Sequence, residues 1–315
     1  MRGLLAAATA ALLMLSGTVG VAAASPVDSL HDLPRPSTGC LHQPAVPLGR
    51  TVVQSMTSGG YDRSYLLHLP ATYTSWHPVP VIMGFHGRKG NGYDIEAFSG
   101  LDALDAIVVY PVGLKGEADQ PAWQGAPYQP PSDDVLFVSN LLDRLQDAYC
   151  VDPLRIYATG KSNGGGFTAL LACRMQNRIA AFATVAGAFY PETRVGCGPG
   201  RPVSIVDFHG TADPTVGYDG EASSHGEPLP PMMDWVQDWA DHDHCGPAVT
   251  TTIGTDITEF AYPNCWGRSD VVHYRVAGAG HTWPGELVDS GPGSATQTIK
   301  ATQIAWDFFM DHPLV

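Results

Sequence analysis

The chain is poor in positive charge, and after its first residues it has no long hydrophobic run. Its 315 residues include 17 lysines and arginines against 31 aspartates and glutamates, so the formal net charge at pH 7 is −14. An acidic surface repels phosphate backbones and anionic lipids, which argues against nucleic acids and membranes as partners. No later apolar stretch reaches the roughly 20 residues that span a bilayer.

The sequence also lacks the cysteine spacing of a zinc site. None of its 6 cysteines forms a C-x2-C pair, the spacing typical of structural zinc sites. Asp241-His-Asp-His-Cys245 resembles a ligand cluster, but residues two apart on a helix point to different faces. We therefore expect no metal and no cofactor.

An even number of cysteines instead favours disulfides and an oxidising compartment. Cys245 and Cys265 flank a Gly/Thr-rich stretch, and Cys173 and Cys197 lie on either side of one predicted strand. Pairing within each couple leaves Cys40 for Cys150, although the count alone permits other connectivities.

The first 24 residues have the pattern of a secretory signal peptide. A basic start at Met1-Arg2 precedes an apolar stretch, Leu4–Val21, and Ala22-Ala-Ala24 offers a cleavage site. The apolar stretch is short and interrupted by Thr, Ser and Gly, which argues against a membrane anchor. We expect residues 1–24 to be removed, residues 25–315 to form one catalytic domain, and the product to be extracellular.

Hydrophobic runs alternate with helical patterns along the mature chain. Two segments near 51–55 and 65–69 are expected to pair as antiparallel strands. Apolar runs typical of strands buried on both faces follow, at 80–85, 106–110, 154–159, 181–186, 203–207 and 271–276. Helical patterns lie between or after them, near 135–145, 165–173, 231–242 and 298–310. This order predicts an α/β fold with a mainly parallel twisted sheet flanked by helices.

Gly160-Lys-Ser-Asn-Gly164 is the most informative motif. It joins the predicted strand at 154–159 to the predicted helix at 165–173. A G-x-S-x-G sequence in this context is a nucleophile elbow, a turn so sharp that its flanking glycines have no room for a Cβ. Ser162 is therefore the candidate nucleophile of an α/β-hydrolase.

The partners of such a serine follow it in the order acid, then histidine. Asp213 lies just after the strand at 203–207, while Asp219 and Asp234 are weaker candidates. Among the 12 histidines, His281 follows the last predicted strand on a Gly-rich loop. These positions predict Asp213 as the acid and His281 as the base.

Two backbone N–H groups are needed for the oxyanion. We expect one from Asn163, directly after the nucleophile, and the other from Arg88 in His86-Gly-Arg-Lys-Gly90, with Lys89 as the alternative. His86 and His209 each precede a glycine just after a strand. We interpret both as structural supports of their loops.

Five segments occur in order along the chain: Gly84–Gly90, Trp123-Gln-Gly125, Tyr157–Phe167, Asp207–Thr215 and Gly280–Gly285. Together they resemble the secreted feruloyl esterases of carbohydrate esterase family 1, close to the group called feruloyl esterase C or D. The resemblance extends from about Cys40 to the C-terminus. It implies the same triad and hydrolysis of feruloyl esters on arabinoxylan or pectin.

The exact ester remains open at this level. Polyhydroxyalkanoate depolymerases and acetylxylan esterases share related loops, although Arg88 stands where the depolymerases commonly carry cysteine. Trp123 and Trp283 are the predicted substrate-stacking residues, chosen over Tyr128, Tyr190 and Tyr218. A binding protein on an inactive hydrolase scaffold is less favoured because all three triad residues are present. A peptidase is another alternative, since Ser-Asp-His triads also cleave amides. We expect a monomer acting on feruloylated polysaccharide.

Overall fold

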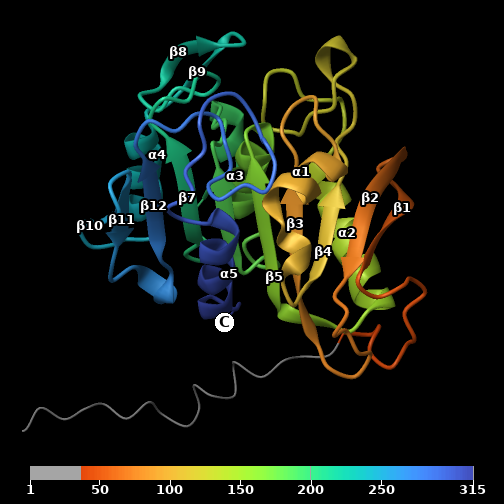
Figure 1. Cartoon of the computed structure of the whole chain (residues 1–315). Helices are drawn as coiled ribbons and strands as arrows, with labels where there is room; N and C mark the ends of the chain where they lie inside the picture. Colours follow the sequence, from red (N-terminus) through yellow and green to blue (C-terminus); the bar gives the residue numbers. More distant parts are fainter. Residues whose placement is uncertain (1–36, 199, 315) are drawn as a thin grey trace, which may run out of the picture. The chain divides into compact units, whose positions relative to one another are not determined.

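Burial of the apolar runs on both faces produces one ten-stranded sheet, β1-β2-β4-β3-β5-β6-β7-β12-β11-β10 (Figure 1). The computed structural model describes residues 37–198 and 200–314, so the predicted signal peptide lies outside the described residues. The strands of this sheet are β1 Arg50–Ser58, β2 Tyr61–Leu69, β3 Val79–Phe85, β4 Ile107–Pro111, β5 Val151–Lys161, β6 Ala181–Val185, β7 Ser204–Gly210, β10 Val249–Ile253, β11 Ile257–Tyr262 and β12 Val271–Val276.

The central strands run parallel, and the two edges are antiparallel. Neighbours from β4 through β3, β5, β6 and β7 to β12 pair in parallel. At one edge β2 pairs antiparallel with β4 and with β1, and at the other β10, β11 and β12 pair antiparallel. Loops that follow the parallel strands therefore gather at one end of the sheet, where ligands bind in open α/β sheets.

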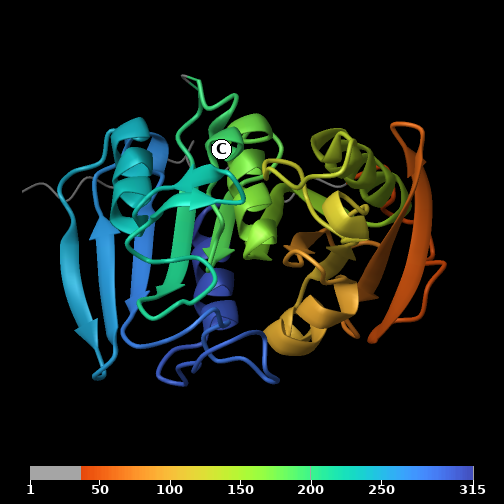
Figure 2. The same ribbon diagram turned by 90° about the horizontal axis from the view of Figure 1, so that it is seen from above.

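Helices cover both faces of the sheet. They are α1 Gly92–Ser99, α2 Asp134–Ala148, α3 Asn163–Arg174, α4 Met232–His242 and α5 Ala301–Asp311. In Figures 1 and 2, α2, α3 and α4 lie on one face and α1 and α5 on the other. Each face has its own apolar core, one containing Phe167 and Trp235 and the other Phe98 and Phe309. This arrangement confirms the predicted α/β fold.

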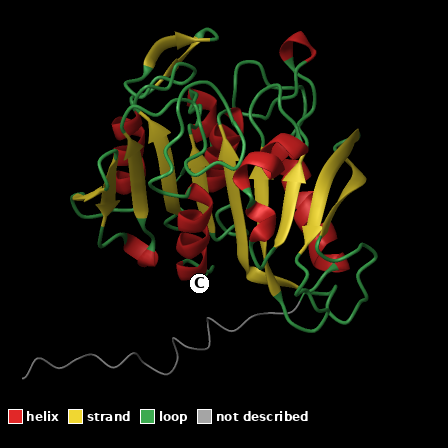
Figure 3. Ribbon diagram, in the orientation of Figure 1, coloured by secondary structure: helices red, strands yellow, loops and turns green. Residues whose placement is uncertain are grey.

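Shorter elements occupy the connections, most of which Figure 3 shows as loops. They are the 3-10 turns η2 Leu101–Ala103, η3 Glu117–Asp119, η4 Pro191–Arg194 and η5 Trp266–Arg268, and the hairpin strands β8 Glu221–Ser224 and β9 Glu227–Leu229. Within residues 37–198 and 200–314, no helix combines the length and apolar character needed to cross a membrane.

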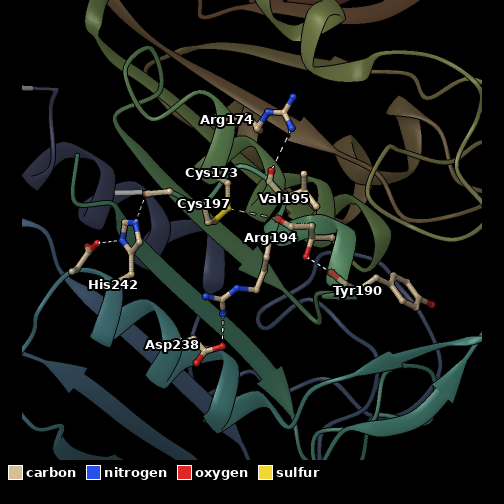
Figure 4. Close-up of a disulfide and its surroundings, with 11 residues drawn as sticks. Cys173, Arg174, Tyr190, Arg194, Val195, Cys197, Asp238 and His242 are labelled. Atoms are coloured by element: carbon tan, nitrogen blue, oxygen red, sulfur yellow. Dashed lines mark hydrogen bonds and ion pairs between the residues drawn. A yellow bond between two sulfur atoms is a disulfide. The ribbon is translucent and has the colours of Figure 1, made fainter. Parts of the chain in front are cut away.

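The six cysteines pair as predicted: Cys40 with Cys150, Cys173 with Cys197, and Cys245 with Cys265. The second disulfide joins the end of α3 to the segment after η4 (Figure 4). Nearby, Arg174 donates to the Val195 carbonyl. The helix that follows Ser162 is thus linked covalently to the segment after η4.

A buried ion pair anchors the loop between β4 and α2. The Arg63 guanidinium lies 2.7 Å from the Asp134 carboxylate, with side-chain exposures of 1% and 0%. The same carboxylate accepts from the Gln124 backbone N–H at 2.9 Å. Asp134 therefore connects β2, the start of α2 and the loop that carries Trp123.

Replacing Asp134 with alanine should lower the free energy of unfolding by about 3–5 kcal/mol, because it leaves the Arg63 charge buried without its partner. Asp143→Ala is the matched control, since it breaks the half-exposed pair between Arg178 and Asp143 and should cost about 1 kcal/mol or less. Urea unfolding of both variants measures the difference. Equal losses would show that burial does not determine the cost of this pair.

Candidate active site

Ser162 sits at the tip of the turn between β5 and α3 in a backbone conformation that L-residues rarely adopt, with φ 59° and ψ −123°. A Cβ on Gly160 would lie 2.3 Å from the Gly164 carbonyl oxygen, and one on Gly164 would lie 2.2 Å from that of Phe85. Neither distance tolerates a side chain. The strained turn therefore requires both glycines of the motif.

Asp213 and His281 meet beside this turn. The Asp213 carboxylate lies 2.8 Å from Nδ1 of His281, and both side chains are buried. Its other oxygen accepts the backbone N–H groups of Thr215 and Val216 at 2.7 and 2.8 Å. The loops after β7 and β12 thus deliver a carboxylate–imidazole pair in a fixed orientation.

The second histidine at this carboxylate is His209. Its Nε2 lies 2.9 Å from the Val216 carbonyl oxygen and 3.4 Å from the Asp213 carboxylate. His209 thus supports the acid's loop, the role predicted for it, although β7 extends to Gly210 and so includes His209. Burial by itself raises the pKa of Asp213, but hydrogen bonds from His209 and His281 outweigh it and hold the pKa below the usual range.

Burial lowers the pKa of His281 below its ordinary value, and the Lys161 charge acts in the same direction. The hydrogen bond to Asp213 opposes both effects. His281 therefore remains a neutral imidazole at a lower pH than a solvent-exposed histidine does. Neutral imidazole is the form that accepts a proton.

Ser162 and His281 line the same cavity, whose volume is about 560 Å³. Its walls come from the loop after β3, helix α1, the β8–β9 hairpin and the segment after His281; the lining residues include Arg88, Tyr93, Phe98, Tyr128, Lys161, Tyr190, Val216, His225 and Ser290. The nucleophile and base candidates are thus accessible to a ligand from one space.

The loop after β3 lies against the nucleophile. A Cβ on Gly87 would lie 3.2 Å from Cβ of Ser162. His86 supports this loop from behind, because its Nδ1 lies 2.7 Å from the Gly87 carbonyl oxygen and its Nε2 accepts the Gly113 N–H at 2.9 Å. Burial lowers the pKa of His86 to about 4, so the ring is neutral and serves as one donor and one acceptor.

The two predicted oxyanion donors lie next to this contact. Asn163 is the first residue of α3, directly after Ser162, and Arg88 follows Gly87. The Arg88 guanidinium points elsewhere, 3.0 Å from the Glu117 carboxylate and 4.1 Å from the centre of the Tyr128 ring. Any contribution of Arg88 to an oxyanion hole would come from its backbone, and that role stays a prediction.

The structure corrects the two tryptophans predicted to stack on substrate. Trp123 and Trp283 are 0% and 1% exposed, and neither lines the cavity. The Trp123 indole N–H donates to the His86 carbonyl oxygen at 2.9 Å, whereas that of Trp283 donates to Thr302. Both rings are packed inside the protein because their N–H groups find backbone or hydroxyl partners there.

Trp123 instead connects the start of α3 with the loop after β3, and we call this arrangement the Trp123 clamp. The Asn163 side-chain oxygen accepts the Trp123 backbone N–H at 2.8 Å, and its amide donates back to the Trp123 carbonyl at 3.3 Å. The indole meanwhile stacks on Phe167 of α3. One residue thus connects the helix after the nucleophile with the loop after β3.

The aromatic walls of the cavity come from tyrosines that the sequence analysis ranked below the tryptophans. Tyr128 and Tyr190 meet edge to face at 5.9 Å, and His225 of the β8–β9 turn contacts Tyr128 at 4.9 Å. The sequence analysis missed His225 and Tyr93. Neither lies at the end of a parallel strand, so strand position gave no signal for them.

Known proteins with similar sequences are named feruloyl esterases. The chain is 33% identical over 230 residues to feruloyl esterase B of Piromyces equi, covering 70% of this chain and 42% of that protein. It is 32% identical over 219 residues to feruloyl esterase D of Neurospora crassa, covering 64% of this chain and 67% of that protein. The chain belongs to the feruloyl esterase family. It spans less than half the length of the Piromyces relative.

Solved structures agree on the fold. The acetyl xylan esterase from Aspergillus awamori superposes with a TM-score of 0.59 at 16% sequence identity, over 82% of this chain and 99% of that one. At this identity the likeness shows the architecture, which is the α/β-hydrolase fold. A scan of protein-family models gives no match.

The clamp formed by Trp123 can be tested by removing its indole N–H. Trp123→Phe should lower kcat for a chromogenic ester roughly tenfold or more, because the loop after β3 loses its link to α3 and small displacements at a reacting centre are costly. Trp283→Phe is the matched control, since its indole bonds only to Thr302, and should change kcat about twofold or less. Equal effects of the two variants would contradict the clamp.

Proposed function

We propose that this chain is a secreted serine esterase that releases ferulic or a related hydroxycinnamic acid from plant cell-wall polysaccharide. The observation that carries the proposal is the meeting of a strained Ser162 and a buried His281–Asp213 pair at one cavity. Membership of the feruloyl esterase family supports the acyl group. The three disulfides support an oxidising, extracellular location.

In the first half of the proposed reaction, Oγ of Ser162 attacks the ester carbonyl carbon while Nε2 of His281 accepts the hydroxyl proton. Asp213 stabilises the imidazolium that forms and keeps Nδ1 as the donor nitrogen. The N–H groups of Asn163 and Arg88 receive the negative oxygen. When the C–O bond to the sugar breaks, His281 returns the proton to the departing alkoxide.

In the second half, water attacks the acyl-serine ester. His281 takes one proton from that water and then returns it to Oγ of Ser162 as the acyl–serine bond breaks. The products are a hydroxycinnamate and the regenerated enzyme. No metal or cofactor enters either step, because the imidazole handles both proton transfers.

A small apolar cluster beside the nucleophile is the proposed acyl-binding wall. Tyr128, Ala188, Tyr190 and Val216 belong to one buried cluster, distinct from the two cores of the sheet, and all four line the cavity. Ala188 lies close to the nucleophile, since its N–H donates to the Ser162 carbonyl at 3.0 Å. Flat aromatic walls favour a planar phenolic acyl group over acetate.

A polyester depolymerase is the second candidate. The observation favouring it is exposed apolar surface at the cavity rim, where Tyr93 and Val288 are 58% and 52% exposed. Catalytic efficiencies on methyl ferulate and a hydroxybutyrate oligomer separate the two candidates. Preference for the oligomer would overturn the feruloyl assignment and leave the triad proposal intact.

Ser162→Ala should reduce kcat on methyl ferulate by roughly three or more orders of magnitude, as deletion of a triad nucleophile does. Because only one hydroxyl is removed, circular dichroism and the melting temperature should stay near wild type. Near-full turnover by Ser162→Ala would exclude this serine as the nucleophile.

In the intact enzyme, kcat/KM should rise with pH through a midpoint below 6.5, since burial lowers the pKa of His281 and only neutral imidazole accepts the proton.

Tyr190→Ala should lower kcat/KM on methyl ferulate about 10- to 100-fold while changing that on ethyl acetate about threefold or less, because only the larger acyl group uses the aromatic wall. Tyr190→Phe is the control. It keeps the ring and removes the tyrosine hydroxyl, which contacts Ser224 at 3.2 Å. Parallel losses on both esters would place the acyl group elsewhere.

A further inference from the structure

The proposed reaction leaves one buried charged group at the cavity without a role. Lys161 precedes the nucleophile at the end of β5, and the residue is only 4% exposed. Its side chain reaches the cavity wall, where Nζ donates to the Ser290 carbonyl oxygen at 2.8 Å. A buried lysine is costly unless it is paired, so this contact calls for an explanation.

The Ser290 carbonyl belongs to a folded segment, residues 286–292. Ser290 donates its backbone N–H to Glu286 at 3.1 Å, and its hydroxyl also contacts that carboxylate. The hydroxyl oxygen of Ser290 accepts the backbone N–H of Trp283 at 2.8 Å. Asp289 receives the Gly291 N–H at 2.9 Å. Lys161 therefore binds to a segment whose conformation is held by its own hydrogen bonds.

This segment supports the base directly. The backbone N–H of His281 donates to the Pro292 carbonyl oxygen at 2.8 Å. A Cβ on Gly291 would lie 2.4 Å from the His281 carbonyl oxygen and 3.0 Å from Nζ of Lys161. Lys161, residues 290–292 and the backbone of His281 are thus in contact one after another.

We propose that Lys161 is a positioning residue that ties the strand carrying Ser162 to the segment supporting His281, and that its positive charge acts on the imidazole. The proposal rests on the catalytic roles proposed above for Ser162 and His281. In this proposal two charged side chains act on His281: Asp213 favours the imidazolium form, and Lys161 disfavours it.

The charges around both groups are consistent with this role. Lys161 is attracted by Asp213 from the loop after β7 and by Glu286 and Asp289 from the 286–292 segment. On the α1 side it faces the Phe98 ring at 5.9 Å. Burial lowers the pKa of Lys161 to about 8, so it is charged throughout the acid range.

His281 in turn is affected by Asp213, Lys161 and His209. The Lys161 charge disfavours imidazolium, whereas Asp213 favours it. Removing the lysine charge should therefore raise the pKa of His281. The acid limb of kcat/KM, which requires neutral imidazole, should move to higher pH.

Three variants separate charge from hydrogen bonding and packing. Lys161→Gln keeps a donor without charge, Lys161→Met removes both and keeps the length, and Lys161→Arg keeps both. In the Gln and Met variants the midpoint of the acid limb should rise by roughly 0.5–1 pH unit, and in the Arg variant it should stay within about 0.2 units of wild type. The plateau kcat should fall about tenfold in the Met variant and less in the Gln variant, which still reaches Ser290.

The same rise in the pKa of His281 should appear in a measurement that needs no substrate. An NMR titration of the His281 ring, assigned with His281→Gln, reports the pKa of the imidazole without any turnover. An unshifted limb and an unshifted ring titration in both neutral variants would overturn the inference, as would an equal shift in Lys161→Arg. Failure of the proposed function is a separate outcome, seen as retained turnover in Ser162→Ala.

Discussion

Three backbones approach one another at the nucleophile turn more closely than any side chain allows. The end of β5, the start of α3 and the end of β3 meet where Cβ atoms on Gly160 and Gly164 would lie 2.3 and 2.2 Å from carbonyl oxygens. This contact forces Ser162 into its positive φ and brings the loop after β3 beside it. The other parts of the site are arranged around that crowding.

The surrounding polar contacts keep the crowded region in a single arrangement. Asn163 exchanges two hydrogen bonds with the Trp123 backbone, and the Trp123 indole donates to the His86 carbonyl. Neutral His86 then holds Gly87, which faces the serine. Strain at a functional turn persists only where its neighbours over-determine the geometry. Here the neighbours are a buried amide, an indole and an imidazole.

The residues that follow the parallel strands could be predicted from the sequence, whereas the packing of side chains from the loops could not. Ser162, Asp213 and His281 each follow a parallel strand, so topology alone brings them to one edge of the sheet. Trp123 and Tyr128 lie in the same loop, and no periodic pattern says which one packs in the core and which one lines the cavity. The structure buries the indole because two groups on different elements bond to that residue, and such long-range partners leave no local signal.

The proposed base, His281, is subject to opposing electrostatic effects from its two sides. Asp213 stabilises imidazolium, and by itself it would raise the pKa of His281. Burial and the Lys161 charge oppose this and lower the pKa. The lysine that carries this charge donates to the Ser290 carbonyl oxygen at 2.8 Å, in the segment whose Pro292 carbonyl accepts the His281 backbone N–H. In the proposed mechanism the acid thus orients the ring, while burial and the lysine favour the neutral imidazole that accepts a proton.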